Sequence, residues 1–489
     1  MVPYACKPFQ GRALATFQHN TARQRGPCNI LFMKDRLKML AHLSFSKHVK
    51  LLVLVFLAAF FFSFSINRAL AAQIRLHSAM AQPIMPLSKG KPRTAYLHID
   101  LQGIALADKK DRAPVNVALV IDRSGSMSGE KLRQAKRAAI MALGLLEPYD
   151  TLSIVTYSNS VNVLVPATHI EDRTMIERRI QQIFPRGATA LYAGVEKGGE
   201  QLMRYLDREK VNRLILLSDG LANIGPKTPD ALAELGYRLI RKGISVTTLG
   251  LGEGYNEDLM TRLANVTDGN HAFVENADEL EKFFALELGD ITSVVGQDLD
   301  IEIHIRPDYR PRRTLWRKST IKGHTVHARL HQVYGAQKKD LTLELQLPAK
   351  QPAGTYEVAD VTVRYKDMGE KKKIVLRDKV RLTLSPSEQK ARNSIDTKIM
   401  ARVISLQAIE KNRAAMKLRD IGKIKAARRL YRANAADLKR KAKYFSAPSL
   451  ARQAAKTEEY SRNLERRRWR KTRKIQAHDS RSLGAGAKY

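Results

Sequence analysis

Five oxygen-bearing side chains in three separate stretches of the sequence have the types and spacing of metal ligands. The stretch VIDRSGSMSG places an acid and two serines at alternate positions, FPRGATALYAG supplies a threonine after a glycine, and VNRLILLSDG carries an acid near its end. The five candidates are Asp122, Ser124, Ser126, Thr189 and Asp219. Hard divalent cations prefer oxygen ligands, and two formal charges with small hydroxyls suit near-octahedral Mg²⁺ better than a larger Ca²⁺ cage. The pattern therefore predicts a Mg²⁺ site, with Mn²⁺ or Ca²⁺ as alternative ions.

The elements that must position these residues alternate between strands and helices. Residues 116–121 are apolar and mostly β-branched, which is typical of a strand buried on both faces of a parallel sheet. Further strands are predicted at 151–158, 211–220 and 244–252, and helices at 172–184, 190–206, 228–242, 256–265 and 277–287. Such alternation predicts an α/β domain with a doubly wound, mostly parallel sheet. Ligands bind at the carboxyl ends of the strands in such sheets, so we expect Asp122 and Asp219 to meet there.

The order Asp122-x-Ser124-x-Ser126, then Thr189, then Asp219 resembles the complete metal-ion-dependent adhesion site of von Willebrand factor A (VWA) domains. The likeness covers about residues 113–290 and implies the VWA/Rossmann-like fold. It also implies that the hydroxyls bind the metal directly, that the acids bind it directly or through water, and that one position stays open. In that family an acidic side chain of a protein partner fills the open position, because the cation is the largest local charge. The stretch VIDRSGSMSGEKL is most similar to the bacterial exported branch, which also resembles inter-alpha-trypsin inhibitor heavy chains.

Three classes of function are compatible with this pattern. The first is a non-enzymatic, Mg²⁺-dependent protein-binding module of the periplasm or cell envelope, whose partner offers an Asp or Glu. The second is a scaffold subunit of an envelope assembly or transport complex, with a structural metal and a basic tail for anionic partners. The third is a metal-dependent hydrolase. A serine nucleophile would need a histidine base, but only His169 and His271 lie in this region and neither belongs to a recognisable motif. We therefore expect no catalytic residues.

Residues 1–72 have the pattern of a leader and a signal peptide. Two lysines precede an apolar run at 51–62, and small residues suited to cleavage follow it. The long stretch before the apolar run indicates that translation starts at Met33 or Met39. We expect an exported protein, periplasmic or in the cell envelope, and the alternative is a protein anchored by an uncleaved 51–66 segment.

Strand-like alternation also flanks the α/β domain. Residues 90–110 contain one such segment, and residues 294–385 contain five more. A single strand is not stable alone, so we expect it to join the later strands in a β-sandwich into which the α/β domain is inserted. The alternative is a sandwich that lies wholly after residue 296, with the early strand paired elsewhere.

The C-terminal part of the chain is strongly basic. Residues 411–489 contain 25 Lys and Arg against 6 Asp and Glu, a net charge of +19 out of +37 for the whole chain. Helical spacing predicts a basic α-helical region at 386–475, followed by a disordered tail at 476–489. The stretch RRRWRKTRK at 466–474 is either a solvated helix end or a contact for an anionic envelope polymer. We expect no nucleic-acid partner, and contact with a membrane only through the signal or anchor.

Overall fold

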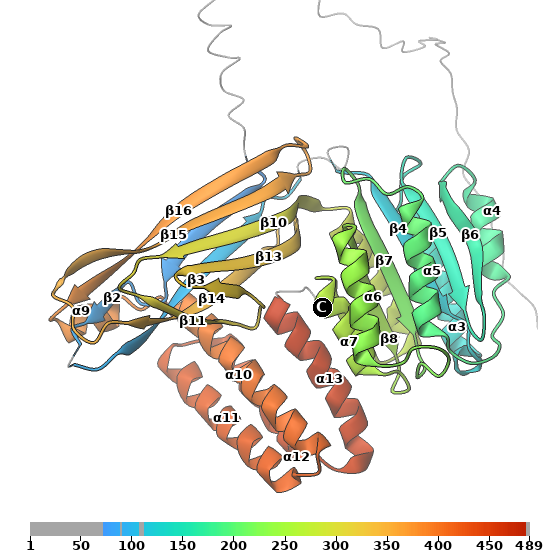
Figure 1. Cartoon of the computed structure of the whole chain (residues 1–489). Coiled ribbons are helices and arrows are strands. Elements are labelled where there is room, and N and C mark those ends of the chain that lie inside the picture. Colours follow the sequence, from blue (N-terminus) through green and yellow to red (C-terminus); the bar gives the residue numbers. More distant parts are fainter. Residues whose placement is uncertain (1–71, 89, 107–111, 486–489) are drawn as a thin grey trace, which may run out of the picture. The chain divides into compact units, whose positions relative to one another are not determined.

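The computed structural model describes residues 72–88, 90–106 and 112–485, and Figure 1 shows their course from blue to red. These residues form an α/β domain, a β-sandwich and a helical C-terminal region. The predicted signal peptide lies outside the described residues, apart from Ala72. Among the helices that are described, none has the length and apolar character needed to cross a membrane.

The α/β domain is built on a six-stranded sheet in the order β6-β5-β4-β7-β8-β9. All neighbouring pairs are parallel except β5 with β6, which is antiparallel. The bounds are β4 (Val115–Asp122), β5 (Thr151–Tyr157), β6 (Val161–His169), β7 (Val211–Ser218), β8 (Ile244–Leu251) and β9 (His271–Val274). Every residue of β4, β5, β7 and β8 is buried, as the apolar runs in the sequence predict for central strands. The two edge strands, β6 and β9, are additions to the prediction.

Helices cover both faces of this sheet, and alternate residues of one strand point to opposite faces. Val117 and Leu119 of β4 share a core with the first group of helices, and Ala118 and Val120 share the other core with the second group. The first group is α3 (Glu130–Gly144), α4 (Arg173–Gln181) and α8 (Leu280–Ile291); the second is α5 (Leu191–Met203), α6 (Pro229–Arg241) and α7 (Glu257–Val266). Gly198 brings α5 close to the sheet, because a Cβ there would lie 2.5 Å from Cγ2 of Val120.

The β-sandwich has two sheets, ordered β1-β3-β14-β11 and β12-β13-β10-β15-β16-β2. Its strands before the α/β domain are β1 (Ile74–Met80), β2 (Ile84–Pro86) and β3 (Arg93–Gly103). The later strands are β10 (Val294–Ile305), β11 (Arg310–Leu315), β12 (Thr320–Lys322), β13 (Thr325–Tyr334), β14 (Lys338–Leu347), β15 (Gly354–Asp367) and β16 (Lys373–Ser385).

The α/β domain is inserted into this sandwich, as predicted. Strand β3, which precedes the domain, pairs antiparallel with β14, which follows it, and Leu97 lies opposite Leu343. The prediction of a single early strand at 90–110 was wrong, because β1 and β2 also precede the insertion. Strand β1 alternates in burial like the others, but it begins directly after the predicted signal peptide and was not recognised.

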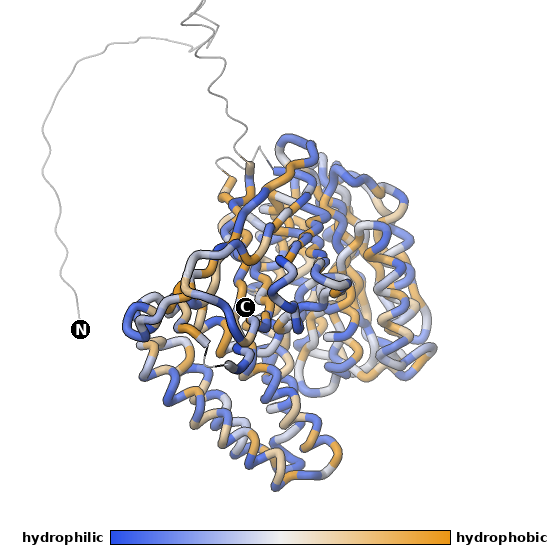
Figure 2. Tube along the Cα trace, turned by 60° about the vertical axis from the view of Figure 1, so that its left-hand side comes forward, coloured by the Kyte–Doolittle hydropathy of each residue, from blue (hydrophilic) through white to orange (hydrophobic). Residues whose placement is uncertain are grey.

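The helical region contains α9 (Glu388–Asn393), α10 (Thr397–Asp420), α11 (Ile424–Tyr444), α12 (Pro448–Arg462) and α13 (Arg466–Ala485). Gly422 makes the turn between α10 and α11 with φ of 80°. Figure 2 shows these helices as largely hydrophilic, with hydrophobic positions recurring along them. The prediction of a disordered tail at 476–489 was wrong for residues 476–485, which continue α13. Four of their polar residues, Gln476, Asp479, Ser480 and Arg481, are buried against other parts of the chain, which a polar composition does not indicate.

Candidate metal site

The two predicted acidic ligands lie close together at the carboxyl ends of two neighbouring strands of the α/β sheet. Asp122 is the last residue of β4, and Asp219 directly follows the end of β7. The two strands are parallel neighbours, with Ile121 opposite Leu217, so their carboxyl ends coincide. Thr189 lies in the loop before α5. The strand-end placement expected from the sequence is therefore what the structure shows.

Hydrogen bonds and close approaches bring the predicted side chains together. The hydroxyls of Ser124 and Ser126 are 3.1 Å apart, and Ser126 Oγ donates to Asp219 Oδ1 at 2.7 Å. A Cβ built at Gly220 would lie 3.2 Å from Thr189 Oγ1 and 3.4 Å from Ser126 Oγ. The threonine and serine hydroxyls thus converge on one small space that a side chain at residue 220 would enter.

Asp122 is held beside this cluster by hydrogen bonds. Its Oδ1 accepts the backbone N–H of Ser124 at 2.8 Å, and its Oδ2 accepts the hydroxyl of Ser218 at 2.8 Å. The side chain is fully buried, and burial raises the pKa of Asp122 to about 6, although these hydrogen bonds lower it and the nearby Asp219 raises it further. A cation at the hydroxyl cluster would offset the cost of burying this charge. The residues present therefore fit a hard divalent cation.

Lys131 is a member of the site that was not predicted. Its Nζ lies 2.5 Å from Asp219 Oδ2 and donates to the carbonyl of Ser126 at 3.3 Å. Lys131 is in the first turn of α3, and side chains in helices lean toward the N-terminus, so it reaches back to the D-x-S-x-S loop. The lysine already supplies positive charge to one oxygen of Asp219 while the other oxygen bonds Ser126. The position of Lys131 just after the loop was the available signal.

The site opens to the surface on one side. Asp122, Ser124, Thr189 and Asp219 are buried, whereas Ser126 is exposed. The loop that carries Ser126 also contacts the loop before α5, because Gly125 N–H donates to the carbonyl of Gly187 at 2.9 Å. An approaching side chain could therefore reach the hydroxyl cluster from the Ser126 side.

The two histidines considered as bases are held by other contacts. His169 is at the end of β6 and pairs with Thr151 at the start of β5. It therefore lies at the amino ends of the parallel strands, whereas the serines follow the carboxyl end of β4. His271 is buried, and its Nδ1 is 2.8 Å from the hydroxyl of Thr248. Within residues 72–88, 90–106 and 112–485, no group of three or more His, Cys, Asp or Glu could hold a metal. The candidate site at the carboxyl ends of β4 and β7 differs from such a group, because three of its five residues contribute hydroxyls.

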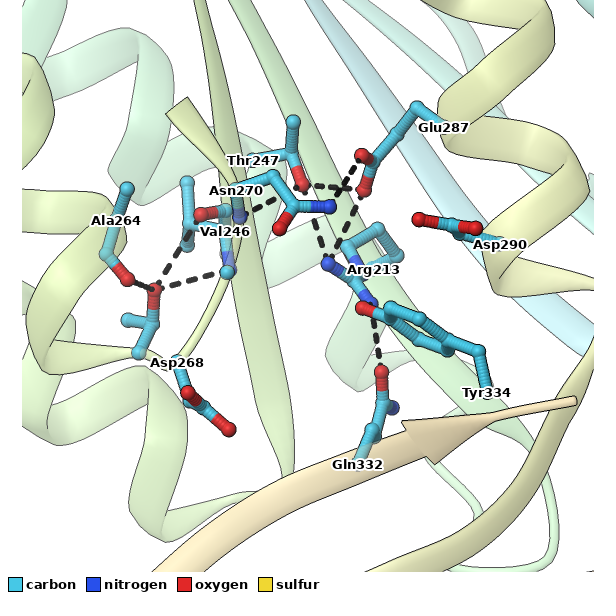
Figure 3. A network of polar contacts seen from close by, with 12 residues as sticks. Arg213, Val246, Thr247, Ala264, Asp268, Asn270, Glu287, Asp290, Gln332 and Tyr334 are labelled. Atoms are coloured by element: carbon cyan, nitrogen blue, oxygen red, sulfur yellow. Dashed lines mark hydrogen bonds and ion pairs between the residues drawn. The ribbon is translucent and has the colours of Figure 1, made fainter. Parts of the chain in front are cut away.

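A second polar cluster lies at the amino end of the sheet and joins the α/β domain to the sandwich (Figure 3). The guanidinium of Arg213 in β7 lies 3.1 Å from Glu287 of α8, and neither side chain is exposed. Arg213 also donates to Gln332 at 2.6 Å and to the hydroxyl of Tyr334 at 2.8 Å, both in β13. An arginine inside the apolar run VNRLILL was a signal for such a partner. Because the cluster is buried and internally hydrogen-bonded, its role is in stability.

The structure divides the basic stretch 466–474 between two environments. Arg473 pairs with Asp258 at 2.8 Å and Asp420 at 3.0 Å, and Lys474 is buried and pairs with Glu257. Trp469 is also buried and donates to Asp420 at 2.9 Å. Both interpretations of the stretch, as a solvated helix end or as a contact for an anionic polymer, were therefore wrong for these residues, which tie α13 to α7 and α10. Four arginines of the stretch remain exposed: Arg466, Arg467, Arg468 and Arg470.

A family model described as "von Willebrand factor type A domain" matches residues 116–286. The chain is 27% identical over 232 residues to YfbK of Escherichia coli K12, covering 47% of this chain and 40% of YfbK. It is 25% identical over 331 residues to sll0103 of Synechocystis, covering 65% of this chain and 77% of the relative. Human inter-alpha-trypsin inhibitor heavy chain H3 is 30% identical over 169 residues, covering 33% of this chain and 18% of H3. The alignments thus span well under two thirds of YfbK and H3.

Solved structures share the fold over most of the chain. A von Willebrand factor type A protein from Catenulispora acidiphila has a TM-score of 0.62 at 14% identity and covers 86% of this chain and 97% of that one. The ArnB paralog VWA2 from Sulfolobus acidocaldarius has a TM-score of 0.57 at 17% identity, with 86% of this chain and 100% of that one covered. The shared fold therefore extends beyond the matched domain into its flanking parts.

Proposed function

From the von Willebrand factor type A domain that residues 116–286 form, we propose that this protein is a metal-dependent protein-binding module whose partner supplies an acidic side chain. Domains of this type are in general protein-interaction modules and typically bind a divalent metal. The observation that carries the proposal is the convergence of three hydroxyls and two carboxylates at the carboxyl ends of β4 and β7, with Ser126 open to solvent. Mg²⁺ suits this donor set, which has few formal charges.

Each residue of the site has a distinct task in this proposal. The hydroxyls of Ser124, Ser126 and Thr189 and the carboxylates of Asp122 and Asp219 would hold the ion. The bound ion would supply the positive charge that attracts the partner's carboxylate. Around the ligand set, the hydroxyl of Ser218 fixes one oxygen of Asp122, and Lys131 fixes one oxygen of Asp219. Outer contacts of this kind orient ligands and tune their affinity.

The proposal is tested by retention of acidic peptides on the immobilised full chain with Mg²⁺ and with chelator. We expect retention with Mg²⁺ and release by chelator, and we expect Thr189→Ala to abolish the Mg²⁺-dependent part. Thr174→Ala removes a hydroxyl from the exposed surface of α4 and serves as the matched control. Retention that is unaffected by chelator would contradict the proposal and favour the alternative hypothesis of a scaffold subunit. In that case the four exposed arginines of α13 are the candidate contact. Turnover of an ester or peptide would favour a hydrolase.

Export to the periplasm or cell envelope is part of the proposal and is supported by the sequence pattern of residues 1–72. Fractionation of cells that express the full chain, followed by N-terminal sequencing, tests both export and cleavage. A protein with an intact N-terminus in the membrane fraction would favour the anchored alternative, and a protein in the cytosolic fraction would contradict export.

A further inference from the structure

Arg123 lies between two of the candidate metal ligands and has an unusual environment. Its backbone is fixed, because its N–H donates to Tyr157 at 2.9 Å and its carbonyl accepts the N–H of Arg186 at 2.7 Å. Its side chain is 7% exposed, and its Nε is buried without a hydrogen-bond partner in the described part of the chain. Burying a guanidinium N–H without an acceptor is unfavourable, so this group is suited to an acceptor from outside the chain.

A second arginine stands close to the first. Arg186 is exposed, and its backbone N–H donates to the carbonyl of Arg123, so the two residues are direct neighbours. No ion pair to either guanidinium is found among the residues that the structure describes. Two neighbouring cations repel each other, and an oxyanion between them would remove the repulsion and accept their N–H groups. The pair therefore favours an anionic ligand.

A pocket beside the metal site gives such a ligand room. It has a volume of about 330 Å³ and is lined by Ser158, Asn159, Ser160, Arg186 and Gly187. Residues 158–160 follow β5, the strand next to β4. The pocket adjoins the D-x-S-x-S loop directly, because Gly187 accepts the N–H of Gly125 at 2.9 Å. Polar side chains and an arginine thus line a space beside the loop that carries Ser126.

We propose that Arg123, Arg186 and this pocket form a subsite for a second carboxylate of the same partner, so that the protein recognises a diacidic peptide segment. One acidic side chain occupies the open metal position, and the other accepts hydrogen bonds from the arginines. A planar guanidinium binds a carboxylate through two parallel hydrogen bonds, which gives direction as well as charge. This inference rests on the proposed function and specifies the class of ligand that the site selects.

The test measures binding of labelled glycine- and alanine-based octapeptides to the full chain by fluorescence anisotropy at about 150 mM salt, where long-range attraction is screened. One peptide carries a single Asp, and three others carry a second acid one, two or three residues further on. With Mg²⁺, we expect at least one diacidic peptide to bind about 10-fold more tightly than the single-acid peptide. Arg186→Gln should remove this difference and leave the affinity for the single-acid peptide within about twofold.

Matched controls separate a lost subsite from a damaged fold or metal site. Arg178→Gln removes an exposed arginine from α4, whose Nε donates only within its own helix, and should leave all affinities unchanged. Calorimetric Mg²⁺ affinity and the melting temperature of Arg186→Gln should match the wild type. Arg123→Gln provides a second variant, with the same selective loss expected for the diacidic peptide.

Three results would decide against one proposal or the other. Equal affinity of the wild type for single-acid and diacidic peptides, or an equal loss for both in Arg186→Gln, would overturn the subsite while the metal-dependent function stands. If chelator leaves the affinity for diacidic peptides unchanged but Arg186→Gln lowers it, the metal-dependent function is overturned and the subsite is retained. Absence of binding by every peptide would overturn both.

Discussion

The buried ion pair of Arg213 and Glu287 permits a quantitative prediction for stability. Both side chains are 0% exposed, and the guanidinium is also hydrogen-bonded to Thr247 at 3.1 Å and to the two residues of β13. Arg213→Met removes the cation and leaves the carboxylate of Glu287 buried with the hydrogen bonds from Thr247 and Asn270. Removing one partner of a buried pair typically costs about 3–5 kcal/mol, because the remaining charge is uncompensated.

The size of this loss sets the expected change in melting temperature. For a domain of 150–250 residues, 1 kcal/mol corresponds to roughly 2–4 °C, so Arg213→Met should lower the melting temperature by about 6–20 °C. The double variant Arg213→Met with Glu287→Gln removes both charges and should recover part of the loss, which a double-mutant cycle measures. The control is an exposed ion pair, Arg238 with Glu196, whose side chains are 49% and 45% exposed and whose charged atoms are 3.3 Å apart. Arg238→Met should lower the free energy of unfolding by less than about 1 kcal/mol.

Thermal and denaturant unfolding of the purified chain, followed by circular dichroism, provide the assay. A melting temperature of Arg213→Met within 2–3 °C of the wild type, roughly 1 kcal/mol, would refute the reasoning, because a compensated buried charge cannot lose its partner at so small a cost. Strict additivity in the double variant would also refute it, since it would mean that the two charges do not interact.

Three further predictions concern the metal site and acid stability. Asp122→Ala or Asp219→Ala should abolish Mg²⁺ binding in calorimetry and leave the far-ultraviolet dichroism unchanged, because both acids lie at strand ends; undiminished binding in both would remove the site assignment. Lys131→Met should raise the Mg²⁺ affinity about 10-fold, since the ammonium on Asp219 repels an incoming cation, and an unchanged affinity would show that the lysine does not compete. Burial is the largest single influence on Asp268 and opposes its ionisation. The positive charges of Lys339 and two arginines together outweigh burial and hold the pKa of Asp268 below its usual value. Its contribution to stability is therefore present above about pH 4 and is lost as the pH falls further, so Asp268→Asn should lower the melting temperature at pH 7 and flatten its acid dependence.

The main strands and helices of the α/β domain could be predicted because their burial follows from local pattern. The two missed strands have weaker signals: β6 contains Pro166, which is typical of an edge, and β9 has only four residues. Helix α13 was partly missed for a different reason. Its polar residues, such as Gln476 and Arg481, are buried against partners that are distant in sequence, and only tertiary packing shows this.

The candidate site shows the same division between local and tertiary information. The placement of its five candidate ligands could be predicted because strand ends, loops and residue types specify it together. The contacts of Ser218 with Asp122 and of Lys131 with Asp219 depend on how separate elements meet, so sequence spacing alone did not reveal them. The arginine subsite was missed likewise, since Arg123 and Arg186 are brought together by a hydrogen bond between two loops.

The attachments of the α/β domain determine which of its surfaces a partner can use. At the amino end of the sheet, Arg213 ties β7 to β13 of the sandwich (Figure 3). At the β9 edge, α13 is joined to α7 through Lys474 and Arg473. The hydroxyl cluster and the polar pocket instead lie on the loops that follow β4, β5 and β7, at the carboxyl end. A partner bound at the hydroxyl cluster contacts the end of the sheet opposite Arg213, so variants of Arg213 should alter stability without altering peptide selectivity.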